Sequence, residues 1–406
     1  MTFSTSRTTR VSYTGERGPI FRLAFSTGLL ALITLGIYRF WGKTRLRRYI
    51  WGSTRLDGDV FEYTGTGLEK FLGFLVSVVI LAVYLAVVQL VLFALGLRFI
   101  VNPRTEAEVL AQLVLIYATF FAVLPLIFYA GYRARRYKLA RTRFRGIRFG
   151  MIHGAGGYVW RAILLLVVSI LTLGLLTPLM TFRLEKYLTD RMFYGDARFV
   201  QGGSWTRLYR SMKHIFIGLG LLVLAAVAGA VLATVAHAAL AAPVAILLGV
   251  VGYVWLIVGM IYFRVHGFAY LTRNKRLGPE IGFDAAPRTG TVIGQYLLGG
   301  LMVAIIVGVV AAILGGISFV LFENRLVSGA EPPLALIIAG VVAYLVLLIF
   351  AGALTMALIT QPVLAHFTST LTITNLEALS KIRQRQHDKG ADAEGFADAL
   401  DIGGAF

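Results

Sequence analysis

Apolar residues occur in long stretches that short polar and basic segments separate. Eight stretches reach or approach about 20 residues, the length that a helix needs to cross the hydrocarbon of a bilayer. They cover about 21–41, 71–97, 109–130, 160–181, 215–239, 243–263, 296–322 and 333–359. Short connections join six of them into three helical hairpins, at 71–130, 215–263 and 296–359. This pattern predicts a polytopic membrane protein.

The two remaining stretches carry a sequence repeat. The tripeptide Thr-Leu-Gly at 34–36 returns 138 residues later at 172–174, and Tyr49 returns at the same offset as Tyr187. A fixed spacing between an apolar and a basic-aromatic segment indicates a duplicated structural unit. The motif positions in the two apolar segments, called the TLG segments below, are Thr34, Gly36, Thr172 and Gly174.

Both TLG segments are short or broken, and basic residues flank each of them at both ends. If both enter and leave on one face, the inner loops hold 33 Lys and Arg and the outer loops hold 3. If all eight stretches span, the two sides hold 15 and 21. The positive-inside rule therefore favours re-entry, with 42–70, 131–159 and 182–214 in the cytoplasm and 98–108 and 323–332 outside. Eight ordinary spans are the alternative.

A second pattern recurs between the apolar stretches. A basic segment containing a Tyr is followed by a Gly and then by a Phe twelve residues after the Tyr. The three copies are Tyr49, Gly58 and Phe61; Tyr137, Gly146 and Phe149; and Tyr187, Gly195 and Phe199. A weaker copy runs from Tyr270 through Gly278 to Phe283. Each copy predicts a basic helix leaving the bilayer, a turn at Gly and a short strand.

We therefore predict an all-α polytopic membrane protein with internally duplicated helical hairpins. The two short TLG segments either re-enter or span, and small cytoplasmic strand and turn elements follow the helices. The expected segments are a cytoplasmic N-terminus (1–20), membrane repeat 1 (21–130), a basic connector (131–159), membrane repeat 2 (160–263), a second connector (264–295), a third hairpin (296–359) and a cytoplasmic C-terminal segment with an acidic tail (360–406).

Composition supports a membrane location. The chain is 58% hydrophobic and 15% charged, whereas soluble domains have about a quarter of their residues charged. The net charge of +19 comes from residues between apolar runs, where they would face anionic lipid headgroups rather than nucleic acid. There is no cysteine, so disulfides and thiol nucleophiles are excluded. We expect no cleaved signal peptide.

Motifs for catalysis and metal binding are missing from the sequence. It contains no GxxxxGK[ST], HExxH or GxSxG pattern, and no Asp or Glu lies in the middle of an apolar stretch. Four histidines fall close to the predicted inner face without metal-ligand spacing: His153, His214, His266 and His366. We expect neither an enzyme nor a cofactor or metal.

The basic interface is the best candidate for a site. Guanidinium groups bind phosphate through two parallel hydrogen bonds, and Trp and Tyr favour the headgroup layer. The candidate residues for an anionic lipid or phosphate are Arg45, Arg47, Arg48, Arg133, Arg135, Arg136 and Lys138, with Trp41, Tyr49, Trp51 and Tyr137 beside them. Simple anchoring of the topology is the alternative interpretation.

Two functions are compatible with these features. The first is a transporter or channel-like protein for a small solute or lipid, because transporters build sites from broken helices. The second is an anionic-lipid-binding scaffold without a pathway. A polar cavity reaching Thr34 and Thr172 would favour transport. The expected partners are membrane lipids, anionic ones in particular, and not nucleic acid; a homo-oligomer is also compatible.

The segment from 34 to 67 resembles the opening of the YjgN-like family of bacterial inner-membrane proteins. It reads TLGIYRFWGKTRLRRYIWGSTRLDGDVFEYTGTG. The resemblance extends over nearly the whole chain and is weakest after about residue 285. It implies a multi-pass protein of the bacterial cytoplasmic membrane. It implies no activity and no catalytic residues.

Overall fold

The structure is a computed structural model that describes residues 8–235, 238–328 and 333–385. The acidic tail expected from the sequence lies outside the described residues. The chain divides into two compact units, which are treated one at a time below. Unit 1 comprises Met1–Gly42, Ser53–Asp59 and Gly202–Ala378, and unit 2 comprises Lys43–Gly52, Val60–Gln201 and Leu379–Phe406.

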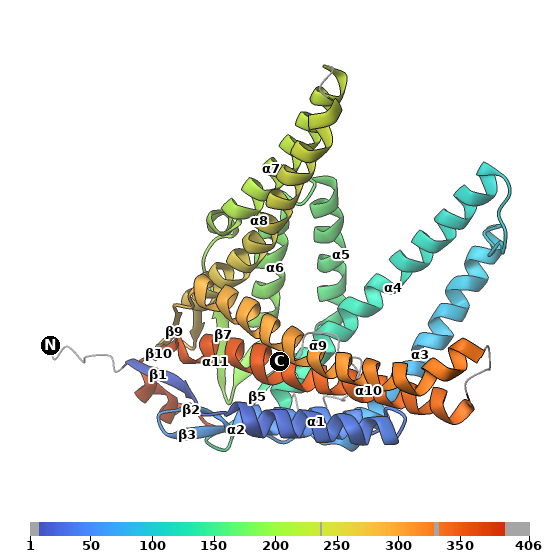
Figure 1. The fold of residues 1–406 in the computed structure, drawn as a ribbon. Coiled ribbons are helices and arrows are strands. Elements are labelled where there is room, and N and C mark those ends of the chain that lie inside the picture. The colour runs from blue at the N-terminus through green and yellow to red at the C-terminus, as the bar shows by residue number, and fades with distance from the viewer. Residues whose placement is uncertain (1–7, 236–237, 329–332, 386–406) are drawn as a thin grey trace. The chain divides into compact units, whose positions relative to one another are not determined.

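The order of elements shows five consecutive repeats, each a strand, a pair of helices and a second strand (Figure 1). The first is β1 (Thr8–Tyr13), α1 (Arg17–Ile33), α2 (Arg39–Gly52) and β2 (Thr54–Leu56). The second is β3 (Asp59–Tyr63), α3 (Gly67–Ala94), α4 (Glu106–Ala140) and β4 (Thr142–Phe144). The third is β5 (Ile147–Met151), α5 (Ala155–Leu171), α6 (Thr177–Thr189) and β6 (Met192–Tyr194).

The last two repeats contain additional short helices. The fourth is β7 (Ala197–Gln201), a 3-10 turn (Trp205–Leu208), α7 (Tyr209–Thr234), α8 (Ala238–Arg273) and β8 (Lys275–Leu277). The fifth is β9 (Ile281–Ala285), α9 (Thr289–Ser328), α10 (Leu334–Thr355), a π-helical segment (Met356–Thr360), α11 (Gln361–Ser369) and β10 (Leu371–Thr374), followed by a 3-10 helix (Leu376–Lys381). The described strands pair antiparallel within each unit, in the order β2-β1-β10-β9-β8 in unit 1 and β3-β4-β5-β6-β7 in unit 2.

The repeats share one hydrogen-bonded junction where the helical pair meets the sheet. The last residue of the first strand lies opposite the first residue of the second: Tyr13 opposite Thr54, Tyr63 opposite Thr142, Met151 opposite Met192 and Ala285 opposite Leu371. In each case the N–H of the next residue donates to the carbonyl of the residue before the second strand. These bonds are Thr14 to Ser53 at 2.8 Å, Thr64 to Arg141 at 2.8 Å, Ile152 to Arg191 at 3.1 Å and Ala286 to Thr370 at 3.4 Å. Each of these helical pairs therefore leaves and returns at one sheet edge, which supports re-entry of both TLG segments.

Among the described residues, six helices are long and apolar enough to cross a membrane, and they form the three hairpins predicted from the sequence. These are α3 with α4, α7 with α8, and α9 with α10. At most 11% of the most apolar 18-residue window of any of them is buried. Surface this apolar and this exposed requires lipid around it.

A helix break occurs at each TLG segment, as the sequence predicts. Leu35 and Leu173 have φ of 50° and 51°, and the following Gly36 and Gly174 have φ of 91° and 84°. Two successive left-handed residues end α1 and α5, after which α2 and α6 begin. Glycine adopts these angles without the clash that a Cβ causes. The matching angles at the two positions support a common structural unit.

Threonine hydroxyls satisfy the freed backbone groups at these breaks. Thr34 donates to the carbonyl of Leu30 at 2.7 Å and accepts the N–H of Tyr38 at 2.9 Å. Thr172 makes the equivalent bonds to Val168 and Leu176 at 2.8 and 3.3 Å. Leu35 and Leu173 are 94% and 90% exposed, because local hydrogen bonds already satisfy the turn.

The Gly positions of the basic-aromatic copies form the turns of β-hairpins, which confirms the predicted strand-like pieces. Gly58, Gly146, Gly195 and Gly278 all have φ between 53° and 86°. The prediction of an all-α fold holds only for the membrane segments, because ten strands of three to six residues join them. The strands that precede the Gly turns are only three residues long, which gives too few alternating positions to predict them from a period-2 pattern.

The motif aromatics pack in unit 2, some of them buried and others half-buried. Phe61 stacks near Phe149 with ring centroids 6.4 Å apart, and Phe149 lies 6.5 Å from Phe199. Tyr137 and Tyr187 are buried at the helix ends above the strands. Repetition of the sequence pattern therefore reflects repetition of a packed helix–strand junction.

Candidate anion-binding site

The predicted basic residues of α2 lie in unit 2 and differ in exposure. Arg45 and Arg48 are exposed, and Arg48 donates to the carbonyl of Gly65 at 3.1 Å. Arg47 is buried and donates to the hydroxyl of Tyr63 at 3.5 Å. Arg47 therefore supports the packing of α2 against β3.

The basic residues of α4 have internal partners in the same unit. Arg135 forms two parallel hydrogen bonds with Glu185 at 2.9 and 3.0 Å. Arg136 is buried and donates to the carbonyl of Met151 at 3.2 Å. These two guanidinium groups hold α4 against α6 and β5 and have little capacity left for a ligand.

The other two predicted residues of α4 are partly exposed. Arg133 donates to the hydroxyl of Tyr129 at 3.2 Å, one turn earlier in the helix. Lys138 is half-buried near the helix end, where its carbonyl accepts the hydroxyl of Thr142 at 2.7 Å. The predicted basic belt thus serves helix–strand packing at several positions, and its role toward lipid stays a prediction.

Glu69 is the centre of a polar cluster that the sequence does not reveal. Its carboxylate accepts two hydrogen bonds from Arg141, both at 3.1 Å, and one from the hydroxyl of Tyr137 at 2.9 Å. Glu69 also belongs to the first turn of α3, where Thr66 caps the helix by accepting the N–H of Glu69. The cluster joins the start of α3 to the end of α4 at the polar end of one hairpin.

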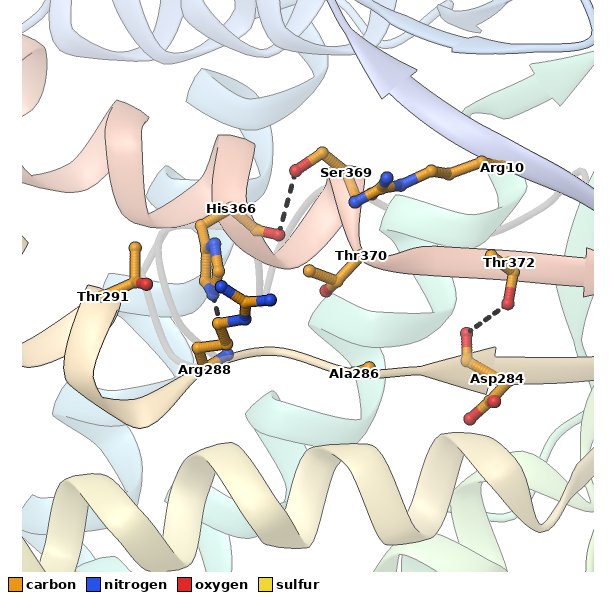
Figure 2. A pocket seen from close by; sticks show the side chains of 9 residues that line it. All are labelled: Arg10, Asp284, Ala286, Arg288, Thr291, His366, Ser369, Thr370 and Thr372. Carbon is orange, nitrogen blue, oxygen red and sulfur yellow. Dashed lines mark hydrogen bonds between the residues drawn. The ribbon is translucent and has the colours of Figure 1, made fainter.

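An open cavity of about 670 Å³ lies in unit 1, where the helices of the fifth repeat meet strands β1, β9 and β10 (Figure 2). We call it the anion pocket. Basic and hydroxyl side chains dominate its lining. The lining residues are Arg10, Asp284, Ala286, Arg288, Thr291, His366, Ser369, Thr370 and Thr372. None of them is among the anion-binding residues predicted from the sequence.

Two arginines give the anion pocket its positive charge. Arg10, on β1, donates from Nε to the carbonyl of Ser369, which leaves its terminal nitrogens for other acceptors (Figure 2). Arg288 precedes α9, and no residue in the described part of the chain forms a hydrogen bond or ion pair with its guanidinium. The carboxylate of Asp284 is paired with Arg273 at 2.9 Å, so it compensates little of this charge.

His366 fixes the position of Arg288. Its Nε2 accepts the backbone N–H of Arg288 at 2.9 Å, which requires an imidazole with no proton on that nitrogen. Hydroxyls surround the two arginines: Thr370 donates to the carbonyl of Phe367 at 2.9 Å and Ser369 to that of His366 at 3.2 Å. Their oxygens keep lone pairs, and both can reorient to donate to a bound anion.

The location of the anion pocket suits a ligand at the membrane boundary. The membrane hairpin of the fifth repeat begins at Thr289 and ends at Ser369, and the pocket opens beside both ends. Arginines and hydroxyls around the start of a long helix can bind a tetrahedral oxyanion such as phosphate. Arg10 and Ser369 are 359 residues apart in the sequence, which explains why no local motif reveals the site.

In the described part of the chain, no three His, Asp or Glu side chains cluster in a way that could hold a metal ion. The histidines predicted near the inner face have separate environments. His214 packs against Tyr262 with ring centroids 4.5 Å apart, and Nδ1 of His266 donates to the carbonyl of Tyr262 at 3.1 Å. His153 lies in unit 2 beside Arg136 at 2.9 Å.

Sequence comparison identifies related proteins. A family model described as a bacterial protein of unknown function (DUF898) matches residues 8–399. Inner membrane protein YjgN of Salmonella typhimurium is 25% identical over 186 residues, which are 45% of this chain and 42% of that protein. YjgN of Escherichia coli K12 is 27% identical over 161 residues, which are 40% of this chain and 35% of that protein. The matched region thus spans less than half the length of each relative. No solved structure matches the chain.

Proposed function

Because the chain belongs to the DUF898 family and is a multi-pass protein of the bacterial inner membrane, we propose that it is a non-enzymatic lipid-binding protein that holds phosphate-bearing headgroups in the anion pocket. The observation that carries the proposal is the pair Arg10 and Arg288 beside an open cavity at the ends of two membrane helices. A lipid whose acyl chains lie along α9 would present its phosphate at this level.

Charge-assisted hydrogen bonds explain the expected affinity. A phosphate oxygen that accepts from a guanidinium gains about 1.5–3 kcal/mol over water. Hydroxyls of Thr291, Ser369 and Thr370 would complete the shell around the remaining oxygens. Anionic lipids would gain most, because their net charge is attracted by the positive protein as a whole.

Transport of a lipid or small solute, the first expectation from the sequence, becomes the second candidate. The re-entrant helix pairs favour it, since transporters use broken helices. Two observations count against a pathway at the TLG segments. The hydroxyls of Thr34 and Thr172 are engaged with their own helices, and the neighbouring leucines face the surroundings. Lipid translocation in vesicles containing the wild-type protein would restore transport as the leading function.

The test compares two lipids that differ only in the phosphate. Purified protein is titrated with phosphatidic acid and with diacylglycerol of the same acyl chains, and bound lipid is measured by native mass spectrometry. We expect tighter binding of phosphatidic acid, and a loss of about tenfold or more in Arg288→Gln. Arg104→Gln, an exposed arginine in the loop before α4, is the matched control and should bind like the wild type. Equal binding of the two lipids would overturn the proposal.

A further inference from the structure

A second cavity of about 680 Å³ lies next to the anion pocket in unit 1 and shares His366 and Ser369 with it. We call it the amide pocket, because the side chains of Gln295 and Gln361 line it. Its lining also includes Glu16 and Arg17, whose opposite charges compensate each other. The two pockets therefore offer different chemistry side by side, with an excess of positive charge in one and amide groups in the other.

Gln361 has a fixed orientation and an unused oxygen. The residue is 4% exposed, and its Nε2 donates to the carbonyl of Gly15 at 2.6 Å. A carbonyl can only accept, so this contact assigns the nitrogen and leaves Oε1 as the free end of the amide. Within the described residues, Oε1 is buried without a hydrogen-bond partner. A buried acceptor left in this way is costly unless a ligand or water donates to it.

Gln295 presents a second buried acceptor in the same pocket. Its Oε1 also has no hydrogen-bond partner among the described residues. Gln295 lies on α9, one turn before Gly299, where a Cβ would meet the carbonyl of Leu358 at 2.6 Å. The residue four positions after Leu358 is Pro362, which has no N–H to donate to that carbonyl. This close contact holds α9 against the π-helical segment and fixes the levels of both glutamines.

We propose, resting on the phosphate binding proposed above, that the amide pocket selects phospholipids whose headgroup carries a hydrogen-bond donor beyond the phosphate. The primary ammonium of an ethanolamine headgroup fits best, because it has three donors for the two amide oxygens. A glycerol headgroup offers the same donor chemistry through hydroxyls. A choline headgroup has no N–H or O–H, and phosphatidic acid has no group beyond its phosphate.

The test measures headgroup preference at constant acyl chains. The wild-type protein is titrated with phosphatidylethanolamine, phosphatidylglycerol, phosphatidylcholine and phosphatidic acid by native mass spectrometry. We expect phosphatidylethanolamine to bind about tenfold more tightly than phosphatidylcholine, the factor that corresponds to about 1.4 kcal/mol. Preference for phosphatidylglycerol over phosphatidylcholine would also support the proposal and assign hydroxyls as donors. Equal binding of ethanolamine and choline lipids would overturn it, while the difference between phosphatidic acid and diacylglycerol tests the phosphate site separately.

Two variants separate recognition from structural damage. Gln295→Met removes one acceptor and breaks no hydrogen bond described for that side chain, whereas Gln361→Met also removes the bond to Gly15. Both should reduce the ratio of ethanolamine to choline binding to about one, with binding of phosphatidic acid and its dependence on Arg288 unchanged. Damage to the fold would weaken all lipids alike. An unchanged ratio in Gln295→Met and Gln361→Met would refute a role for the amide pocket.

Discussion

Replacement of Gly174 by Ala tests the backbone reasoning at the TLG segments. Gly174 has φ of 84°, and only the hydroxyl of Thr177, at 3.7 Å, lies near the position that a Cβ would take. Space is therefore not limiting, and the cost comes from the left-handed conformation, about 1–2 kcal/mol for a residue with a Cβ. The same change at Gly36, with φ of 91° and open space around it, should cost a similar amount.

The matched control lies in the helix that precedes this break. Gly156, near the start of α5, also has open space around its Cβ position, but its φ is not in the left-handed region. Gly156→Ala should stabilise the helix by up to about 0.5–1 kcal/mol. The two variants should thus differ by about 2 kcal/mol, or roughly 4–8 °C in Tm for a unit of 150–250 residues.

Thermal unfolding in detergent, followed by intrinsic fluorescence, measures this difference. We expect Tm to decrease in the order Gly156→Ala, wild type, Gly174→Ala. A Gly174→Ala protein as stable as Gly156→Ala would refute the argument, because it would show that the break relaxes to a conformation that any residue accepts. The double change at both TLG glycines should lower Tm further, since the sites are independent.

Further predictions concern topology and the polar cluster of unit 2. The chain has no cysteine, so single cysteines can report the side of the membrane. Asp59→Cys and Thr206→Cys should resist an impermeant thiol reagent in intact cells, whereas Asn102→Cys should react. All three positions are exposed, so labelling of Thr206→Cys would contradict the topology. Glu69→Gln removes the charge that three hydrogen bonds share and should lower the free energy of unfolding by about 1–3 kcal/mol. Exposed Glu106→Gln should change it by less than about 0.5 kcal/mol, and an equal effect of both would argue against the cluster.

The sequence predicts those features that local physics determines. A run of about 20 apolar residues is long enough to span a bilayer as a helix, so the three hairpins can be predicted from the positions of the apolar runs. The breaks at Gly36 and Gly174 and the turns at Gly58 and Gly146 follow from the tolerance of glycine for positive φ. The sequence reveals only two of the five repeats as a clear duplication, because the strands are short and the helical pairs differ in length.

The candidate site could not be predicted for a different reason. Arg10 and Arg288 are single basic residues far apart in the sequence, and only the pairing of β1 with β10 and of β10 with β9 brings them to one cavity. The arginines that form obvious clusters, such as Arg135 and Arg136, instead meet acceptors inside unit 2. In this protein, clusters of basic residues in the sequence indicate which side of the membrane a loop lies on, but they do not indicate the ligand site.

The pairing of β1 with β10 also sets the order in which this protein can be completed during synthesis. Thr8 to Arg10 pair with Thr372 to Thr374, so one edge of β1 stays without its partner until nearly every membrane helix has been inserted. An unpaired strand edge invites association with other chains. A chain whose synthesis ends before β10 would be inserted in the membrane with the β10-facing edges of β1 and β9 unpaired. Chains truncated before residue 371 should therefore aggregate or be degraded although all six membrane helices are present.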